Sequence, residues 1–108
     1  MTLLDITTHA RDGLAHVVLN GELDLSTIAR LEQELTRVEG ERPETIALDL
    51  RRLSFLDSSG LRVVVSADQR ARREGRRLVV VRGPETVQRV FSITHLDKQL
   101  ELVDELPA

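Results

Sequence analysis

The stretch LSFLDSSGL, residues 53–61, marks the point where a strand gives way to a helix. The run before it, residues 45–50, is almost wholly apolar, which is typical of a strand covered on both faces. Behind it, apolar residues recur at helical spacing, namely Leu61, Val64, Val65 and Ala71. We therefore expect a helix from about Ser58 to Glu74, although three successive valines at 63–65 lower the local helix propensity.

Upstream of this stretch, the sequence predicts two strands and a helix. A loose alternation at 3–8 and a compact apolar run at 15–19 are typical of strands. The segment that follows has one apolar helical face, formed by Ile28, Leu31, Leu35 and Val38. We expect Asp24 or Ser26 to cap this helix and Gly40 to end it.

Downstream, the same alternation of strand and helix continues. Residues 78–81 predict a buried strand, and Pro84 suits the first turn of a third helix. The inner stripe of that helix is Val87, Val90 and Phe91. Residues 99–103 predict a last short strand. The order β-β-α-β-α-β-α-β predicts an α/β fold, with a mixed, largely parallel central β-sheet packed by α-helices.

The composition limits the class of protein. A chain of 108 residues fits one domain, so we expect a single domain over residues 1–108. The absence of cysteine excludes disulfides, thiol catalysis and cysteine metal sites. A net charge of -3 without Trp or Tyr argues against direct nucleic-acid binding. No apolar run approaches the ~20 residues of a membrane helix, and no signal peptide is recognisable. We expect a cytoplasmic protein that does not bind membranes.

One basic cluster interrupts this acidic chain: Arg70, Arg72, Arg73, Arg76 and Arg77. The simpler interpretation is the C-terminal end of the second helix, where cations complement the helix dipole and Gly75 ends the helix. A specific anionic ligand is the alternative.

Residues 57–60, Asp-Ser-Ser-Gly, place hydroxyl groups at a helix N-terminus. Several N–H groups have no intrahelical partner there, so an anion is stabilised. A phosphate on Ser58 would therefore leave the fold intact, and Gly60 would let another backbone approach closely. The structural alternative is a helix cap formed by Asp57, Ser58 or Ser59, and the two roles are compatible.

Enzyme, metal and cofactor chemistry have little support in the sequence. A serine nucleophile needs a positioned base such as histidine, and Asp57 beside Ser58 does not make such a pair. His9, His16 and His95 lie in no motif, and we expect each to be an exposed or edge residue. The acids lack metal-ligand spacing, and the chain has neither a P-loop nor G-x-G-x-x-G. We expect no catalysis, metal or cofactor, and a hydrolase using Ser58 is the enzyme alternative.

Two segments resemble the STAS domain family, and most closely its stand-alone bacterial anti-sigma factor antagonists. They are Gly21-Glu22-Leu23-Asp24 before the first helix and residues 53–61 before the second. Their order and separation make the match specific, and the resemblance spans about residues 3–103. It implies the STAS fold for the sheet and helices expected above.

The resemblance also implies a switch operated by phosphorylation. An unphosphorylated antagonist binds an anti-sigma factor, often a GHKL-type serine kinase, and releases the sigma factor. The kinase phosphorylates the first serine of the D-S-S-G motif, which matches Ser58, and a PP2C-type phosphatase reverses this. Asp24 matches a family acid beside the phosphorylation site. Asp57, Ser59 and Gly60 match the rest of the motif.

The C-terminal end departs from the family pattern. Family members usually carry a final helix, but residues 104–108 are too few for a stable helix and contain Pro107, so we expect that helix to be short or missing. A second function stays open, namely a non-switching STAS docking subunit of another complex, such as a transporter ATPase. The hydroxyl at Ser58 favours the switch, because a pure docking module could use any small residue there.

Overall fold

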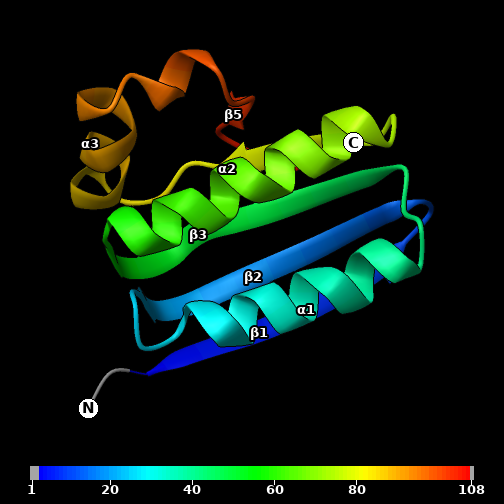
Figure 1. The fold of residues 1–108 in the computed structure, drawn as a ribbon, viewed down its shortest axis with the longest axis horizontal. Helices are drawn as coiled ribbons and strands as arrows, with labels where there is room; N and C mark the ends of the chain where they lie inside the picture. Colours follow the sequence, from blue (N-terminus) through cyan, green and yellow to red (C-terminus); the bar gives the residue numbers. More distant parts are fainter. Residues whose placement is uncertain (1–2, 108) are drawn as a thin grey trace.

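A five-stranded sheet forms the centre of the molecule in this computed structural model, which describes residues 3–107. The strand order is β1-β2-β3-β4-β5, with β1 antiparallel to β2 and the other neighbours parallel. The strands are β1 (Leu4–Arg11), β2 (Leu14–Leu23), β3 (Thr45–Leu56), β4 (Arg77–Val81) and β5 (Leu102–Val103). The helices are α1 (Ile28–Gly40), α2 (Ser58–Arg73), α3 (Glu85–Ile93) and the short 3-10 helix η1 (Leu96–Lys98). The predicted mixed α/β sheet and element order are confirmed (Figure 1).

The helices α1 and α2 lie side by side against one face of the sheet (Figure 1). The residues of β2 that are buried in the core are Ala15, Val17, Leu19 and Leu23. They belong to the same core as α1 residues that recur every three or four positions, such as Leu31 and Leu35. The core is aliphatic apart from Phe91 of α3, which is fully buried.

Four strands differ in length from the expectation by more than one residue, and β1 and β2 run to Arg11 and Leu23, beyond the expected 3–8 and 15–19. β3 continues beyond the apolar run at 45–50, through Leu53 and Phe55, to Leu56, and its pairing with β2 shifts register twice beyond Val18. Such irregularities bend a strand and change the direction of its side chains. The end of the strand therefore cannot be predicted from an alternation of apolar residues. The last strand is only Leu102–Val103, because the N–H groups of residues 99 and 100 donate to Leu96 in a turn.

The start of α1 also differs. Thr27 occupies the N-cap position without a side-chain cap hydrogen bond, so the prediction that Asp24 or Ser26 caps α1 is wrong. The Asp24 carboxylate instead accepts hydrogen bonds from the N–H and hydroxyl of Ser26, at 2.9 and 2.7 Å, in the preceding turn. Gly40 is the last residue of α1, as expected.

The second helix matches its predicted span closely. The ambiguous valines at 63–65 are helical, and Val64 is fully buried. Val63 is also buried, whereas Val65 is only half-buried, so the inner face is turned slightly from the one expected. Residues 104–107 follow β5 without a helix. Within residues 3–107, no helix is both long and apolar enough to cross a membrane.

Candidate functional site

Asp57 is the cap of α2. Its backbone is extended, and its Oδ1 accepts hydrogen bonds from the N–H groups of Ser59 at 2.9 Å and Gly60 at 3.1 Å. Among the three cap candidates of the sequence, the structure therefore selects Asp57. The carboxylate satisfies two of the first-turn donors, and the side chain of Ser58 takes no part in capping.

Ser58 is the first residue of α2, and it is exposed. Its hydroxyl makes no hydrogen bond to residues 3–107. The neighbouring Ser59 is half-buried. Because the helix is capped by another side chain, a change at the Ser58 hydroxyl leaves the cap in place.

Gly60 fixes how closely the start of α2 approaches the sheet. A Cβ atom at this position would lie 2.7 Å from Leu23 Cγ and 2.7 Å from Leu56 Cδ1. The expectation that another backbone approaches Gly60 is therefore wrong, because the close neighbours are side chains. These side chains come from the last residues of β2 and β3, so the start of α2 is packed onto both strand ends.

The structure brings Asp24 and Asp57 to the same edge of the sheet. Leu23 and Leu56 are paired in the parallel β2–β3 ladder, and each acid directly follows one of them. The N–H of Asp57 also donates to the Leu23 carbonyl at 3.3 Å. The edge that carries Ser58 therefore has a negative field from two half-buried carboxylates.

Exposed apolar side chains surround this edge. Leu25, directly after Asp24, is 73% exposed, and Phe55, near the end of β3, is 46% exposed. Leu3 is 63% exposed, and its carbonyl accepts from Glu22, the residue paired with Phe55. A contiguous apolar patch rimmed by polar residues is typical of a protein-binding surface. We call Leu3, Leu25 and Phe55 the apolar rim.

Arg62 is a site residue that sequence reasoning missed. It lies four residues after Ser58, so the two share one face of α2. Its side chain is exposed and has no ion-pair partner within residues 3–107. The i, i+4 spacing from a candidate phosphorylation site is the signal that could have identified it.

A second polar cluster lies in the middle of the sheet. Asp49 of β3 is 3% exposed, and its Oδ2 lies 2.8 Å from His16 Nε2 and 2.7 Å from Arg51 Nη2. Burial alone would raise the pKa of Asp49, but hydrogen bonds from Arg51 and His16 lower it to about 2. The expectation that His16 is exposed or at an edge is wrong, since it is half-buried on β2 inside the sheet.

No catalytic arrangement forms around Ser58 in the part of the chain that the structure describes. His16 is bound to Asp49, and no base donates to or accepts from the Ser58 hydroxyl. Residues 3–107 contain no group of three or more His, Cys, Asp or Glu residues that could hold a metal ion.

The chain is similar to known proteins in both sequence and fold. The family model of the STAS domain matches residues 5–107. The anti-sigma-F factor antagonist RsfB of Mycobacterium tuberculosis is 30% identical over 103 residues, which cover 95% of this chain and 84% of that protein. The anti-sigma-B factor antagonist of Staphylococcus aureus is 31% identical over 102 residues, 94% of each chain. The crystal structure of an anti-sigma factor antagonist from Mycobacterium paratuberculosis matches with a TM-score of 0.89 at 28% identity, covering 96% of this chain and 88% of that one.

Proposed function

The chain belongs to the STAS domain family, and from this premise we propose that it is an anti-sigma factor antagonist. In this proposal the unphosphorylated protein binds an anti-sigma factor, which then releases its sigma factor. The observation that carries the proposal is the exposed Ser58 hydroxyl at the start of α2, on an edge lined by the apolar rim. Relatives that are 30% and 31% identical carry the names of such antagonists.

In this proposal the apolar rim contacts the partner, and phosphorylation of Ser58 controls whether the partner binds. Burying an exposed Leu or Phe side chain in an interface contributes about 1.5–3 kcal/mol. A phosphate on Ser58 would add about -1.5 to -2 charges in the middle of that surface. A partner that covers Ser58 removes the water that solvates this charge, so phosphorylation and binding oppose each other.

Two charged side chains of the chain would lie near the phosphate, one attracting it and one repelling it. Arg62, one helical turn away, can pair with it at i, i+4 spacing. Asp57 has already taken two of the first-turn N–H groups, and its carboxylate repels a second anion. Because Ser58 is exposed, the free domain solvates the phosphate and stays folded.

The resemblance to the family implies the kinds of partner enzyme. We propose a GHKL-type serine kinase as the anti-sigma factor and a PP2C-type phosphatase as the enzyme that removes the phosphate. Asp24 and Asp57 would form the surface that both enzymes recognise around Ser58, and half-buried Ser59 and buried Gly60 would hold the start of α2 in place behind it. The chain itself would be a single domain over residues 1–108 without catalytic activity, and its place would be the cytoplasm, where sigma factors meet RNA polymerase.

Titration calorimetry against the cognate anti-sigma factor tests the switch. Repulsion from one partner carboxylate ~4 Å away costs about 4 kcal/mol at an effective dielectric constant of about 20. Each 1.4 kcal/mol is about tenfold in affinity, so a nanomolar complex should weaken to the micromolar range. Wild type and Ser58→Ala should bind tightly, and Ser58→Asp should bind poorly.

The matched control is the neighbouring hydroxyl. Ser59→Ala should bind like wild type and accept a phosphoryl group from the kinase and ATP, seen by intact mass spectrometry, whereas Ser58→Ala should not be modified. Equal affinities of Ser58→Ala and Ser58→Asp would exclude the switch and leave a plain docking subunit. A covalent adduct of Ser58 with a fluorophosphonate probe would instead favour a hydrolase.

A further inference from the structure

Arg76 is a buried cation with too few partners. Its side chain is only 7% exposed, and its Nε and Nη1 have no hydrogen-bond partner within residues 3–107. Its Nη2 has a weak contact with Glu74 Oε1 at 3.5 Å. A guanidinium stays charged at all relevant pH values, and a buried charge without partners is costly. The Arg76 side chain therefore needs hydrogen-bond acceptors that residues 3–107 do not supply.

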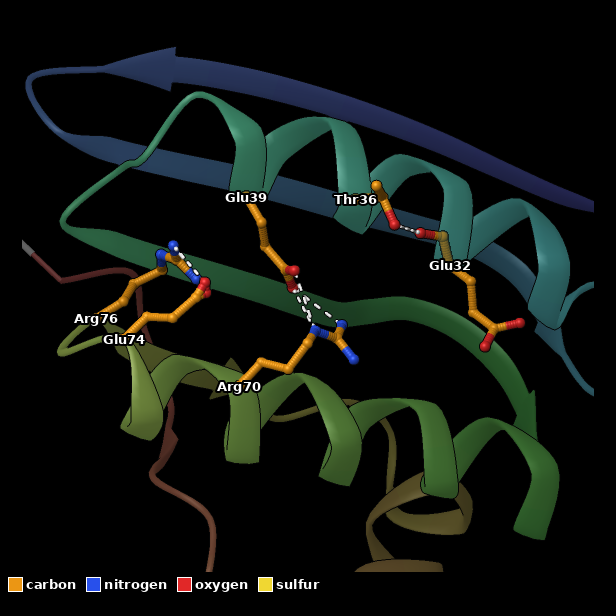
Figure 2. Close-up of polar contacts among 6 residues, drawn as sticks. All are labelled: Glu32, Thr36, Glu39, Arg70, Glu74 and Arg76. Carbon is orange, nitrogen blue, oxygen red and sulfur yellow. Dashed lines mark hydrogen bonds and ion pairs between the residues drawn. The ribbon is translucent and has the colours of Figure 1, made fainter.

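The other arginines of the basic cluster differ from Arg76. Three of them are paired with carboxylates: Arg70 with Glu39, Arg72 with Asp68, and Arg77 with Glu101. Figure 2 shows Arg70 reaching from α2 to Glu39 on α1, and Arg76 turned toward Glu74 beyond the end of α2. Ion pairing and the helix end explain these three arginines, but they do not explain Arg76.

The backbone holds Arg76 in a fixed place. Gly75 has a φ of +70°, a left-handed conformation that ends α2 and turns the chain. The N–H of Arg76 then donates to the Ala71 carbonyl at 2.8 Å, and the N–H of Arg77 donates to the Glu44 carbonyl at 3.0 Å. The guanidinium is thus presented by a rigid turn, as in a preorganised binding site.

A cavity of about 590 Å³ adjoins this guanidinium, between the ends of α1 and α2. Its second cation is Arg42, which is exposed and has no side-chain partner within residues 3–107. Glu39 also lines the cavity, and its charge is neutralised by Arg70, with three N···O contacts of 2.9 to 3.2 Å. Glu44 also lines the cavity, and its carboxyl group lies near the β1–β2 turn, 3.3 Å from the position of a Cβ atom on Gly13.

We propose that this cavity binds a small oxyanion, a phosphate or carboxylate group, with Arg76 as its anchor and Arg42 as its second cation. Planar guanidinium forks hold two oxygens of such an anion at once. Within residues 3–107, the carboxylate in contact with Arg76 is Glu74, whose side chain is 47% exposed and can swing into water when the ligand enters. α2 has 16 residues, so this site lies about 24 Å from Ser58 along the helix and is independent of the proposed switch.

Thermal unfolding in rising concentrations of inorganic phosphate, acetate or chloride, at constant ionic strength, tests the site. Phosphate or acetate should raise the melting temperature of wild type in a saturable way, and chloride should not. The stronger of the two distinguishes a phosphate from a carboxylate ligand. Arg76→Met should fold, because an apolar side chain suits a buried site, and its affinity should fall about tenfold to a hundredfold.

Three further variants make the result specific. Arg76→Lys keeps the charge but loses the planar fork, so it should also bind more weakly. Glu74→Gln should bind more tightly, because the competing carboxylate is gone. Arg73→Gln, an exposed arginine at the end of α2 outside the cavity, should behave like wild type. An equal anion response of wild type and Arg76→Met, or no response of wild type, would overturn the proposal, since phosphate also stabilises proteins by exclusion from their surface.

Discussion

At the start of α2, two adjacent side chains have separate roles. The Asp57 carboxylate accepts hydrogen bonds from two N–H groups, whereas the Ser58 hydroxyl has no hydrogen-bond partner among residues 3–107. We expect Ser58→Asp to change the free energy of unfolding by less than about 0.5 kcal/mol, as for surface substitutions in general. Asp57→Ala removes the cap and should cost about 1 kcal/mol, or about 4–8 °C in melting temperature. Thermal unfolding of both variants checks this, and the reverse order of stability would mean that Ser58 is the structural residue.

At the same scale, local motifs were easier to predict than long-range contacts. Ser58 at a helix start is a property of consecutive residues, and the sequence predicted it. The contact between His16 and Asp49 depends on the register of β2 against β3, which no local pattern contains. Arg76 was predicted as part of a helix end, but its burial depends on the loop that follows α1. The cap of α1 was predicted wrongly because Asp24, Ser26 and Thr27 all have capping side chains.

Among the elements, the start of α2 packs closely onto the ends of β2 and β3 at Gly60. We expect Gly60→Ala to destabilise the fold by about 1–3 kcal/mol, because its methyl group would overlap Leu23 and Leu56. Gly40→Ala is the matched control, since no atom lies within 4 Å of a Cβ at that helix end. It should be neutral or stabilising by up to about 1 kcal/mol. Urea unfolding measures both, and equal effects would contradict the packing described for Gly60.

The element order was predictable because strands and helices differ in apolar period, and each period is visible in a short window. The lengths were less predictable. β3 extends six residues beyond the apolar run at 45–50, through Arg51 and Arg52, because its irregular pairing with β2 places these polar residues in a strand. β5 is shorter than the apolar content at 99–103 suggests, because the N–H groups of residues 99 and 100 donate hydrogen bonds to Leu96 in the turn after η1.

For the whole molecule, Asp49 makes stability depend on pH through a contact between two strands. Its carboxylate joins His16 of β2 to Arg51 of β3 while 3% exposed. Burial would raise the pKa of Asp49, but the hydrogen bonds from Arg51 and His16 lower it to about 2 in the folded state. In the unfolded chain an aspartate has a pKa of ~3.9. The unfolded state therefore binds more protons between these two values, and stability rises with pH across that window.

The stabilisation is complete above about pH 4 and is lost as the pH falls through the folded pKa of about 2. The difference between the two pKa values corresponds to about 2–3 kcal/mol, of which about 2 kcal/mol is lost by pH 2. We therefore expect the free energy of unfolding of wild type to fall by about this much more than that of Asp49→Asn between pH 5 and pH 2. Other carboxylates with lowered pKa values, such as Glu34 and Glu101, are present in both proteins and cancel in the comparison. Urea titrations at each pH measure the difference, and parallel curves for the two proteins would show that the cluster at Asp49 does not couple the strands to protonation.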